Sequence, residues 1–566
     1  MKIIHLSLQP DHHQDYGISS RTEDKNFQRL LGGFMVALFV GLSLLVLGVL
    51  FSLHIVRGAP LMLTPGPWCT SDGCLQQAGY LQRSANTSVR PCQDFYSFVC
   101  HNWAPDRNSQ QVEYIADVPA EMRNHWRLKN AALLFNGSLE PPSFERASAV
   151  FKACILRTEK DQTSDLEKFK TIMRDAGIPW PDDPSSLKHP LAVLLDLDAN
   201  LGAPVWFKVR VQGDLGSPRV VIEPNYLYDT LYKGLDKPTS IKRMAEFHQM
   251  YGTQPNTTEL EESADLDMLI ATSLRDSLEN RENNPQLTSI GDLHHITPDI
   301  NSSYWLSLFN HHFEQALLEN NDAILIQNAQ LLSSITFFVG NISNKKMLHV
   351  IGWWFAQLYT SVADVRALRI IFGALDKNLL GAICLHQIKQ RYGAAVLTGY
   401  VGSQFTKEHK TAVERVLNSV QIQLTNKLRS VNWTTETRRE EMLEKVNSTR
   451  IYIWPSPAFE VTFNETFPEA PSSYFDFWAT RTKSLREQKA SQKKRRNDIN
   501  LLPGYTDPMF SYDQWENAVS ISLATLSPPW YYKDGSAAII YGTLGWHFAR
   551  TLSMAIVSTV SLFLKT

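Results

Sequence analysis

The sequence predicts a mainly α-helical protein with more than one domain, attached to a membrane by one N-terminal helix. Three observations support this prediction. The chain has 566 residues, 43% hydrophobic and 20% charged, which is an ordinary globular composition and enough for several hydrophobic cores. One long early stretch contains no charged residue. From about residue 92 to 450, apolar residues recur at steps of three and four, as amphipathic helices require.

The N-terminus predicts a tail and an anchor. Residues 1–29 are polar and lack apolar periodicity, so we expect a flexible cytoplasmic tail. Residues 30–56 contain no Asp, Glu, Lys or Arg and, at ~1.5 Å per residue, are long enough to cross ~30 Å of hydrocarbon. A cleaved signal peptide is the competing interpretation, but the apolar run is too long and no small-residue cleavage site follows it. We therefore predict a transmembrane signal-anchor helix over 30–56.

The charges around this span predict its orientation. Four basic residues precede the span, namely Lys2, Arg21, Lys25 and Arg29, whereas only Arg57 follows it directly. The positive-inside rule then gives a single-pass type II protein of the plasma membrane with an extracellular ectodomain. The membrane is thus one expected partner, whereas a net charge of −2 gives no reason to expect nucleic acid.

Sequons and cysteines agree with a secretory route, because all of them lie after the span. The expected N-glycosylation sites are Asn86, Asn136, Asn256, Asn301, Asn341, Asn432, Asn447 and Asn464. The cysteines are Cys69, Cys74, Cys92, Cys100, Cys154 and Cys384. An even number suggests disulfides in an oxidising compartment, but six cysteines allow fifteen connectivities, and spacing alone does not choose among them. A cysteine zinc site is the weaker interpretation, because no CxxC pair exists.

The rest of the chain divides by its patterns. Residues 57–91 are expected to form a stem. Helical periodicity follows, for example over 144–156, 305–318, 346–375 and 409–428. Residues 205–223 alternate, are rich in β-branched side chains and are broken by Gly-Ser-Pro, which predicts extended structure.

Two later stretches have an unusual composition. Residues 481–496 are strongly basic, and we interpret them as a solvated helix or loop. Cleavage after KKRR by a basic-residue-specific protease and binding of heparin-like polyanions are the alternatives. Residues 552–564 are apolar but too short for a second membrane span, so we expect a buried helix there.

Residues 91–103 read PCQDFYSFVCHNW, which is a highly specific pattern. It resembles the start of the ectodomain in the neprilysin family of membrane zinc endopeptidases, which includes neprilysin and the endothelin-converting enzymes. Further agreement comes from the C-x4-C spacing of Cys69 and Cys74, and later from Trp433, Thr437, Arg438, Lys445, Ile451 and Pro455. The resemblance implies a neprilysin-like two-lobed ectodomain. Residues 92–450 would form the large helical capping lobe, and 451–566 an incomplete thermolysin-like lobe.

The resemblance also implies a disulfide pattern. Cys69 would pair with Cys74, and Cys154 with Cys384. The family's counterparts of Cys92 and Cys100 bond to cysteines near the far C-terminus, and this chain has no cysteine after Cys384. We therefore expect these two to lack their family partners. They could pair with each other, stay free or bridge to another chain.

The active-site region aligns in register with the family pattern. Residues 512–531 align without gaps to the family's strand and turn, with matches at Asn517, Ile521, Leu526, Pro528, Pro529 and Tyr531. Tyr541 and Gly542 then match the family's YGGIG. In this register the substrate-binding Asn-Ala falls on Met509 and Phe510, and the HExxH motif falls on Arg550, Thr551, Leu552, Ser553 and Met554.

These substitutions remove the chemistry of the family. HExxH supplies two imidazoles that bind zinc and a glutamate that acts as general base. Arg550 places a cation where zinc would sit, Met554 is a poor zinc ligand, and Thr551 cannot act as the base. The sequence also stops before the family's third ligand and its transition-state-stabilising histidine. Elsewhere, His311 to Glu314 begin an inverted HxxEH that lacks its final histidine, and His294–His295 is an isolated pair. We predict no bound cofactor for this chain, whereas active family members hold zinc.

Three hypotheses follow. The first is a proteolytically inactive ectoprotein that binds peptides or a neprilysin-family partner chain. The second is a partial or mis-spliced chain of an active zinc metalloendopeptidase that cleaves extracellular peptides. The third is a product that does not fold and is retained in the endoplasmic reticulum, because a partial lobe exposes apolar surface.

Overall fold

The computed structural model describes residues 69–104, 117–137, 142–157, 163–184, 188–212, 219–232, 234–280, 285–373, 379–389, 406–454, 473–480, 510–513 and 517–563. Chain contacts separate Met1–Thr70 from a second unit, Ser71–Thr566, which contains almost all of these residues. The predicted tail and anchor, 1–29 and 30–56, lie outside the described residues. Within the described ranges, no helix has both the length and the apolar character needed to cross a membrane.

The second unit is mainly helical, as the sequence predicts. Its N-terminal helices are α2 (Asp72–Ser84), α3 (Phe95–Cys100), α4 (Val118–Asn136), α5 (Pro142–Ile155), α6 (Thr163–Ala176), α7 (Pro190–Ala199), α8 (Leu227–Tyr232), α9 (Lys237–Tyr251), α10 (Thr257–Glu279), α11 (Ser302–His312), α12 (Ala329–Asn341), α13 (Asn344–Tyr359) and α14 (Arg366–Phe372). Residues 379–389 and 474–480 are also helical. The later helices are α16 (Lys407–Arg429), α17 (Glu436–Ser448), α20 (Ala537–Ile540) and α21 (Trp546–Phe563).

Two small sheets accompany the helices in the described part of the chain. The first has the order β1-β2-β4-β3, from β1 (Phe207–Gln212), β2 (Arg219–Pro224), β3 (Gln286–Ser289) and β4 (Ala323–Ile326). Strands β1 and β2 pair antiparallel and account for the predicted extended stretch 205–223. The second sheet has the order β5-β7-β6, from β5 (Arg450–Trp454), β6 (Phe510–Asp513) and β7 (Ala518–Ser522). In it, β5 runs parallel and β6 antiparallel to β7.

The larger hydrophobic core is dominated by aromatic side chains and runs from α4 to residues 379–389, joined by residues 474–478. At its centre Trp354 is fully buried, with its ring 4.5 Å from Tyr232 and 5.3 Å from Trp206. The buried carboxylate of Asp267 accepts hydrogen bonds from Trp354 Nε1 and from the Tyr232 hydroxyl, each at 2.7 Å. This core therefore combines dense aromatic packing with polar groups that have partners.

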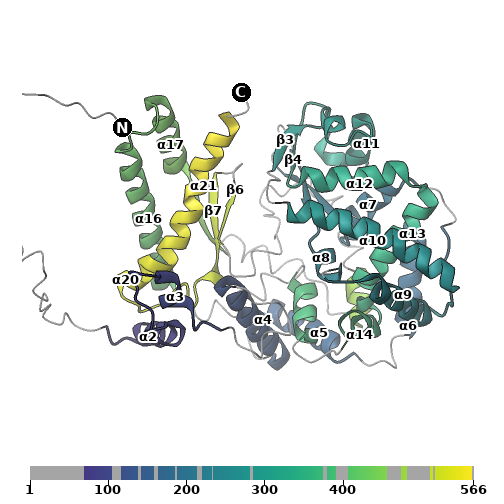
Figure 1. Cartoon of the computed structure of the whole chain (residues 1–566), viewed down its shortest axis with the longest axis horizontal. Helices are drawn as coiled ribbons and strands as arrows, with labels where there is room; N and C mark the ends of the chain where they lie inside the picture. The colour runs from purple at the N-terminus through teal and green to yellow at the C-terminus, as the bar shows by residue number, and fades with distance from the viewer. Residues whose placement is uncertain are drawn as a thin grey trace, which may run out of the picture. The chain divides into compact units, whose positions relative to one another are not determined.

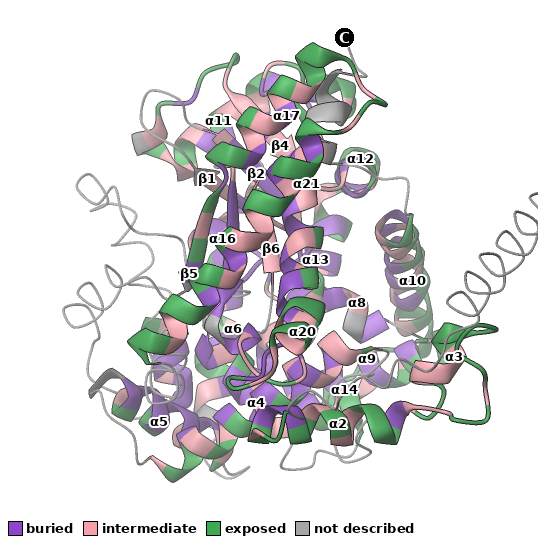
Figure 2. Cartoon of the chain, turned by 90° about the vertical axis from the view of Figure 1, so that its left-hand side faces the viewer, coloured by how far each residue is buried: buried purple, intermediate pink, exposed green. Residues whose placement is uncertain are grey.

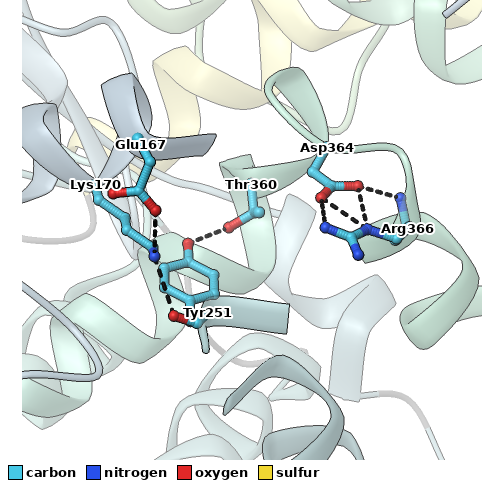
Figure 3. A network of polar contacts seen from close by, with 6 residues as sticks. All are labelled: Glu167, Lys170, Tyr251, Thr360, Asp364 and Arg366. Carbon is cyan, nitrogen blue, oxygen red and sulfur yellow. Dashed lines mark hydrogen bonds and ion pairs between the residues drawn. The ribbon is translucent and has the colours of Figure 1, made fainter. Parts of the chain in front are cut away.

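The predicted helix over 346–375 is wrong in its middle, because the chain breaks after α13. The Thr360 hydroxyl bonds the Tyr251 hydroxyl at 2.7 Å, and the buried carboxylate of Asp364 accepts from the backbone and the guanidinium of Arg366. These contacts hold the turn between α13 and α14. Figure 3 shows this network, together with a lysine of α6 that reaches the end of α9.

The smaller core contains α16, α17, the second sheet and α21, which lie side by side in Figure 1. Helix α21 contacts α16, α17 and β6. The family resemblance implies one helical lobe over 92–450, whereas α16 and α17 pack with the C-terminal sheet and α21. The reason is that their apolar faces, including Val413, Leu417 and Met442, are covered by side chains of that sheet and of α21.

Candidate functional site

The region that corresponds to a zinc site begins at the second sheet. Central strand β7 is buried along its whole length. After it the chain passes through residues 523–536 to α20, the π-helical turn Tyr541–Gly545 and then α21. Gly545 lies in contact range of the Tyr541 ring, since a Cβ built there would be 3.3 Å from Tyr541 Cδ1. Helix α21 follows this turn directly and contacts β6.

Asn517 fixes the start of β7. It has a positive φ of 46°, a conformation that non-glycine residues rarely adopt but asparagine tolerates. Its Oδ1 accepts from the Tyr512 hydroxyl at 2.9 Å and the Thr449 hydroxyl at 3.0 Å, and its Nδ2 donates to the Lys445 carbonyl at 2.8 Å. One side chain thus joins β6, the end of α17 and the start of β7, which explains an asparagine at this position.

The two faces of α21 differ. Phe548 and Leu552 are fully buried in the smaller core, and Ala555 is also fully buried. At 100° per residue, Trp546, Arg550 and Met554 lie on the opposite face. Trp546 is 55% and Met554 49% exposed, and Arg550 is exposed. Figure 2 shows exposed and buried positions interleaved along α21.

The three residues at the zinc-motif positions have different surroundings. Arg550 and Met554 lie on the exposed face. Thr551 is almost fully buried, and its hydroxyl donates to the His547 carbonyl at 3.0 Å, so it acts only within the helix. Ser553 likewise donates to the Arg550 carbonyl at 2.7 Å.

These side chains do not fit zinc. A guanidinium has no lone pair to offer a metal, a thioether is a poor ligand for zinc, and the Thr551 hydroxyl is already bonded to the backbone. Met509 lies outside the described residues. Phe510 has no side-chain amide with which to bind a substrate backbone.

Phe510 instead packs on His547. The imidazole lies 5.8 Å from the Phe510 ring, 4.4 Å from Trp530 and 4.9 Å from Trp546. Burial lowers the pKa of His547, and the nearby Arg550 guanidinium lowers it further. The ring is therefore neutral at pH 7 and belongs to an aromatic cluster that joins β6 to α21.

Other histidines noted in the sequence stay in pairs. The rings of His294 and His295 are 4.0 Å apart, and those of His311 and His312 are 4.9 Å apart. In the described part of the chain, no three His, Cys, Asp or Glu side chains are grouped as a metal site requires.

The cysteines divide into bonded and free residues. Cys154 and Cys384 form a disulfide with a Cα–Cα distance of 5.8 Å, as the resemblance implies. Cys69 and Cys74 are also disulfide-bonded. Cys92 is exposed, Cys100 is partly exposed, and both are free thiols.

Most sequons lie on the surface. Six of their asparagines are exposed and Asn86 is partly exposed, whereas Asn464 lies outside the described residues; the exposed ones are Asn136, Asn256, Asn301, Asn341, Asn432 and Asn447. Asn256 and Asn301 cap α10 and α11 through Oδ1, which leaves the amide nitrogen free for a glycan. Glycosylation at these sites stays a prediction.

Sequence reasoning missed the exposed face of α21 and the aromatic cluster around His547. The sequence did contain a signal for the exposed face. Trp546, Arg550 and Met554 are spaced by four residues, and the apolar residues Phe548, Leu552 and Ala555 lie between or next to them. The aromatic cluster had no local signal in the sequence, since Phe510 and Trp530 approach His547 only in the folded chain.

Comparisons with known proteins agree with this architecture. Residues 91–455 match peptidase family M13. Neprilysin-2 of Caenorhabditis elegans is 22% identical over 537 residues, which covers 84% of this chain and 70% of that protein. Endothelin-converting enzyme 1 of Cavia porcellus is 20% identical over 533 residues, which covers 85% of this chain and 67% of that protein. For neprilysin-11 of Caenorhabditis elegans the match spans only 61% of the relative.

Solved structures share the fold at low identity. The zinc metalloprotease ZMP1 of Mycobacterium tuberculosis, in complex with an inhibitor, matches with a TM-score of 0.58 and 14% identity, over 83% of this chain and 73% of that one. PEPO from Lactobacillus rhamnosis matches with a TM-score of 0.56 and 13% identity, over 82% and 76%.

Proposed function

The chain belongs to peptidase family M13, a family of zinc metallopeptidases, and on that premise we propose that it is a non-proteolytic, neprilysin-like ectoprotein that binds peptides or a partner chain. The observation that carries this proposal is the side-chain set at the zinc-motif positions. Arg550, Thr551 and Met554 offer neither the two imidazoles nor the general base that family chemistry needs. What remains is a folded α21 with an exposed face.

Zinc content and cleavage test the proposal. We expect the detergent-solubilised full chain to hold far less than one zinc per molecule and to cleave no fluorogenic peptide in a chelator-sensitive way. The matched control is the double variant Arg550→His and Met554→His, which restores two imidazoles at i and i+4 and should raise zinc binding. Stoichiometric zinc with cleavage that a chelator abolishes in the unmodified chain would refute the proposal.

The membrane topology is part of the same proposal. The apolar stretch 30–56 and the surface sequons support a type II protein with its ectodomain outside the cell. Treatment of the cell-expressed full chain with an N-glycosidase should lower its apparent mass. Surface biotinylation should label it at the plasma membrane, and exclusive retention in the endoplasmic reticulum would favour a chain that fails to fold.

A competing candidate is a partial or mis-spliced product of a gene for an active zinc metalloendopeptidase. The abrupt end of the family match after Gly545 favours it, because the register is ungapped from Tyr512 to Tyr541 and translation into a wrong sequence would produce such a break. Sequencing the transcript across the codons for 545–555 decides between the two. An in-frame HExxH would support the competing candidate, and the codons for RTLSM would exclude it.

A further inference from the structure

We propose that Trp546, Arg550 and Met554 form a binding strip for acidic peptides, with Arg550 holding an Asp or Glu side chain between two apolar contacts. This inference rests on the proposed non-proteolytic function and adds the class of ligand. The three side chains lie on the face of α21 opposite its buried residues.

The first support is the charge of the strip. Among the described residues, no hydrogen bond or ion pair occupies the Arg550 guanidinium, in contrast to Arg275 and Arg366, which pair with Asp229 and Asp364. No Asp or Glu occurs anywhere in 541–563, and the neighbouring His547 is held neutral by burial. Nothing on this helix therefore competes with an incoming carboxylate, which a guanidinium binds through two parallel hydrogen bonds.

The second support is the residue types beside the charge. Trp, Arg and Met are enriched where proteins bind partners, and methionine adapts its shape to different apolar ligands. Single exposed apolar residues are common on any surface. Here, however, Trp546 and Met554 flank on one helix face a cation that has no ion pair within the described ranges.

The third support is the spacing of the three side chains along α21, which favours a ligand with an extended backbone. Residues four apart on a helix are separated by about 6 Å along its axis. Alternate residues of an extended peptide point to the same side and are about 6.6 Å apart. An extended peptide with the order apolar, any residue, acidic, any residue, apolar therefore places its three side chains opposite Trp546, Arg550 and Met554 together.

No N-glycosylation sequon lies on α21 itself. Residues 541–566 contain no asparagine, and the sequons of the smaller core lie at Asn432, beyond the end of α16, and Asn447, near the end of α17.

Fluorescence anisotropy with a labelled peptide tests the inference. The probe is Leu-Ser-Glu-Ser-Leu with blocked ends, so that its only carboxylate is the glutamate. We expect saturable binding to the full chain that falls at least about tenfold for Arg550→Gln, as loss of a charged hydrogen bond implies. Arg438→Gln, an exposed position on α17, is the matched control and should bind like the unmodified chain.

A variant with the opposite charge distinguishes loss of binding from misfolding, because a misfolded variant would bind neither peptide. Arg550→Glu should lose the glutamate peptide and bind Leu-Ser-Lys-Ser-Leu instead. The inference fails if the unmodified chain does not bind the probe, if the Arg550 variants bind it equally well, or if a peptide with glutamine in place of glutamate binds as tightly. Zinc content and chelator-sensitive cleavage are measured on the same preparation. If the probe does not bind and the chain holds no zinc and cleaves no peptide, only the binding strip is refuted and the proposed function stands. Chelator-sensitive cleavage would instead refute the proposed function itself.

Discussion

The two hydrophobic cores of Ser71–Thr566 are built by different means. The larger one buries tryptophans, tyrosines and a carboxylate whose hydrogen bonds are satisfied by neighbouring side chains. The smaller one packs mainly aliphatic and phenylalanine side chains of α16, α17 and α21 on a three-stranded sheet. In the first, aromatic and polar groups cross-link distant helices. In the second, α21 is packed on one face and exposed on the other.

The largest effect is expected from Trp354→Ala in the larger core. Removing this fully buried ring leaves a cavity and takes one donor from Asp267. The free energy of unfolding should fall by about 4–5 kcal/mol. Urea titration followed by circular dichroism measures this loss. Trp433→Ala is the control, because that ring is 68% exposed and its removal should change stability by less than about 0.5 kcal/mol.

In the smaller core we expect a loss of about 3–4 kcal/mol for Phe548→Ala, since this side chain is fully buried but has no buried polar partner. Ile422→Ala, at an exposed position of α16, is the control. Calorimetry of both core variants sharpens the comparison. If Phe548→Ala and Trp354→Ala lower the midpoint of the same single transition equally, the two cores unfold together and differ only in composition.

Asp267 should make the larger core sensitive to pH. Burial raises the pKa of its carboxyl from 3.8 to about 6. The folded state therefore binds this proton more tightly, so the stabilisation is complete below pH 3.8 and is lost as the pH rises through 6. Relative to Asp267→Asn, the unmodified chain should lose about 2 kcal/mol between pH 4.5 and pH 7. Urea titrations at several pH values measure the difference.

Asp276→Asn, an exposed position on the same helix, serves as the control for this pH dependence. Parallel pH profiles for the unmodified chain and Asp267→Asn would show that Asp267 is not the responsible group.

The smallest expected effect is the difference in stability between two substitutions at Asn517. Asn517→Ala removes its side-chain hydrogen bonds and forces alanine into a positive φ, for a loss of about 2–3 kcal/mol. Asn517→Gly removes the same bonds without the backbone cost and should recover about 1 kcal/mol. Equal thermal stability of the two variants would mean that the positive φ contributes nothing.

Much of the fold could be predicted from local patterns. Spacing of apolar residues predicts α5 and α16 to within two residues, and alternation predicts β1 and β2. The spacing of apolar residues does not predict the end of α13. The Thr360–Tyr251 hydrogen bond in that region forms only after helices far apart in the sequence pack together.

The sequence by itself determined the family pattern, the mainly helical character and the identity of the side chains at the zinc-motif positions, because these depend on residue types and short spacings. Only the tertiary structure decided that α16 and α17 pack with the C-terminal sheet and that His547 lies among three aromatic rings. Periodicity tells which face of a helix is apolar, but the element that covers that face is chosen by contacts between residues far apart in the chain.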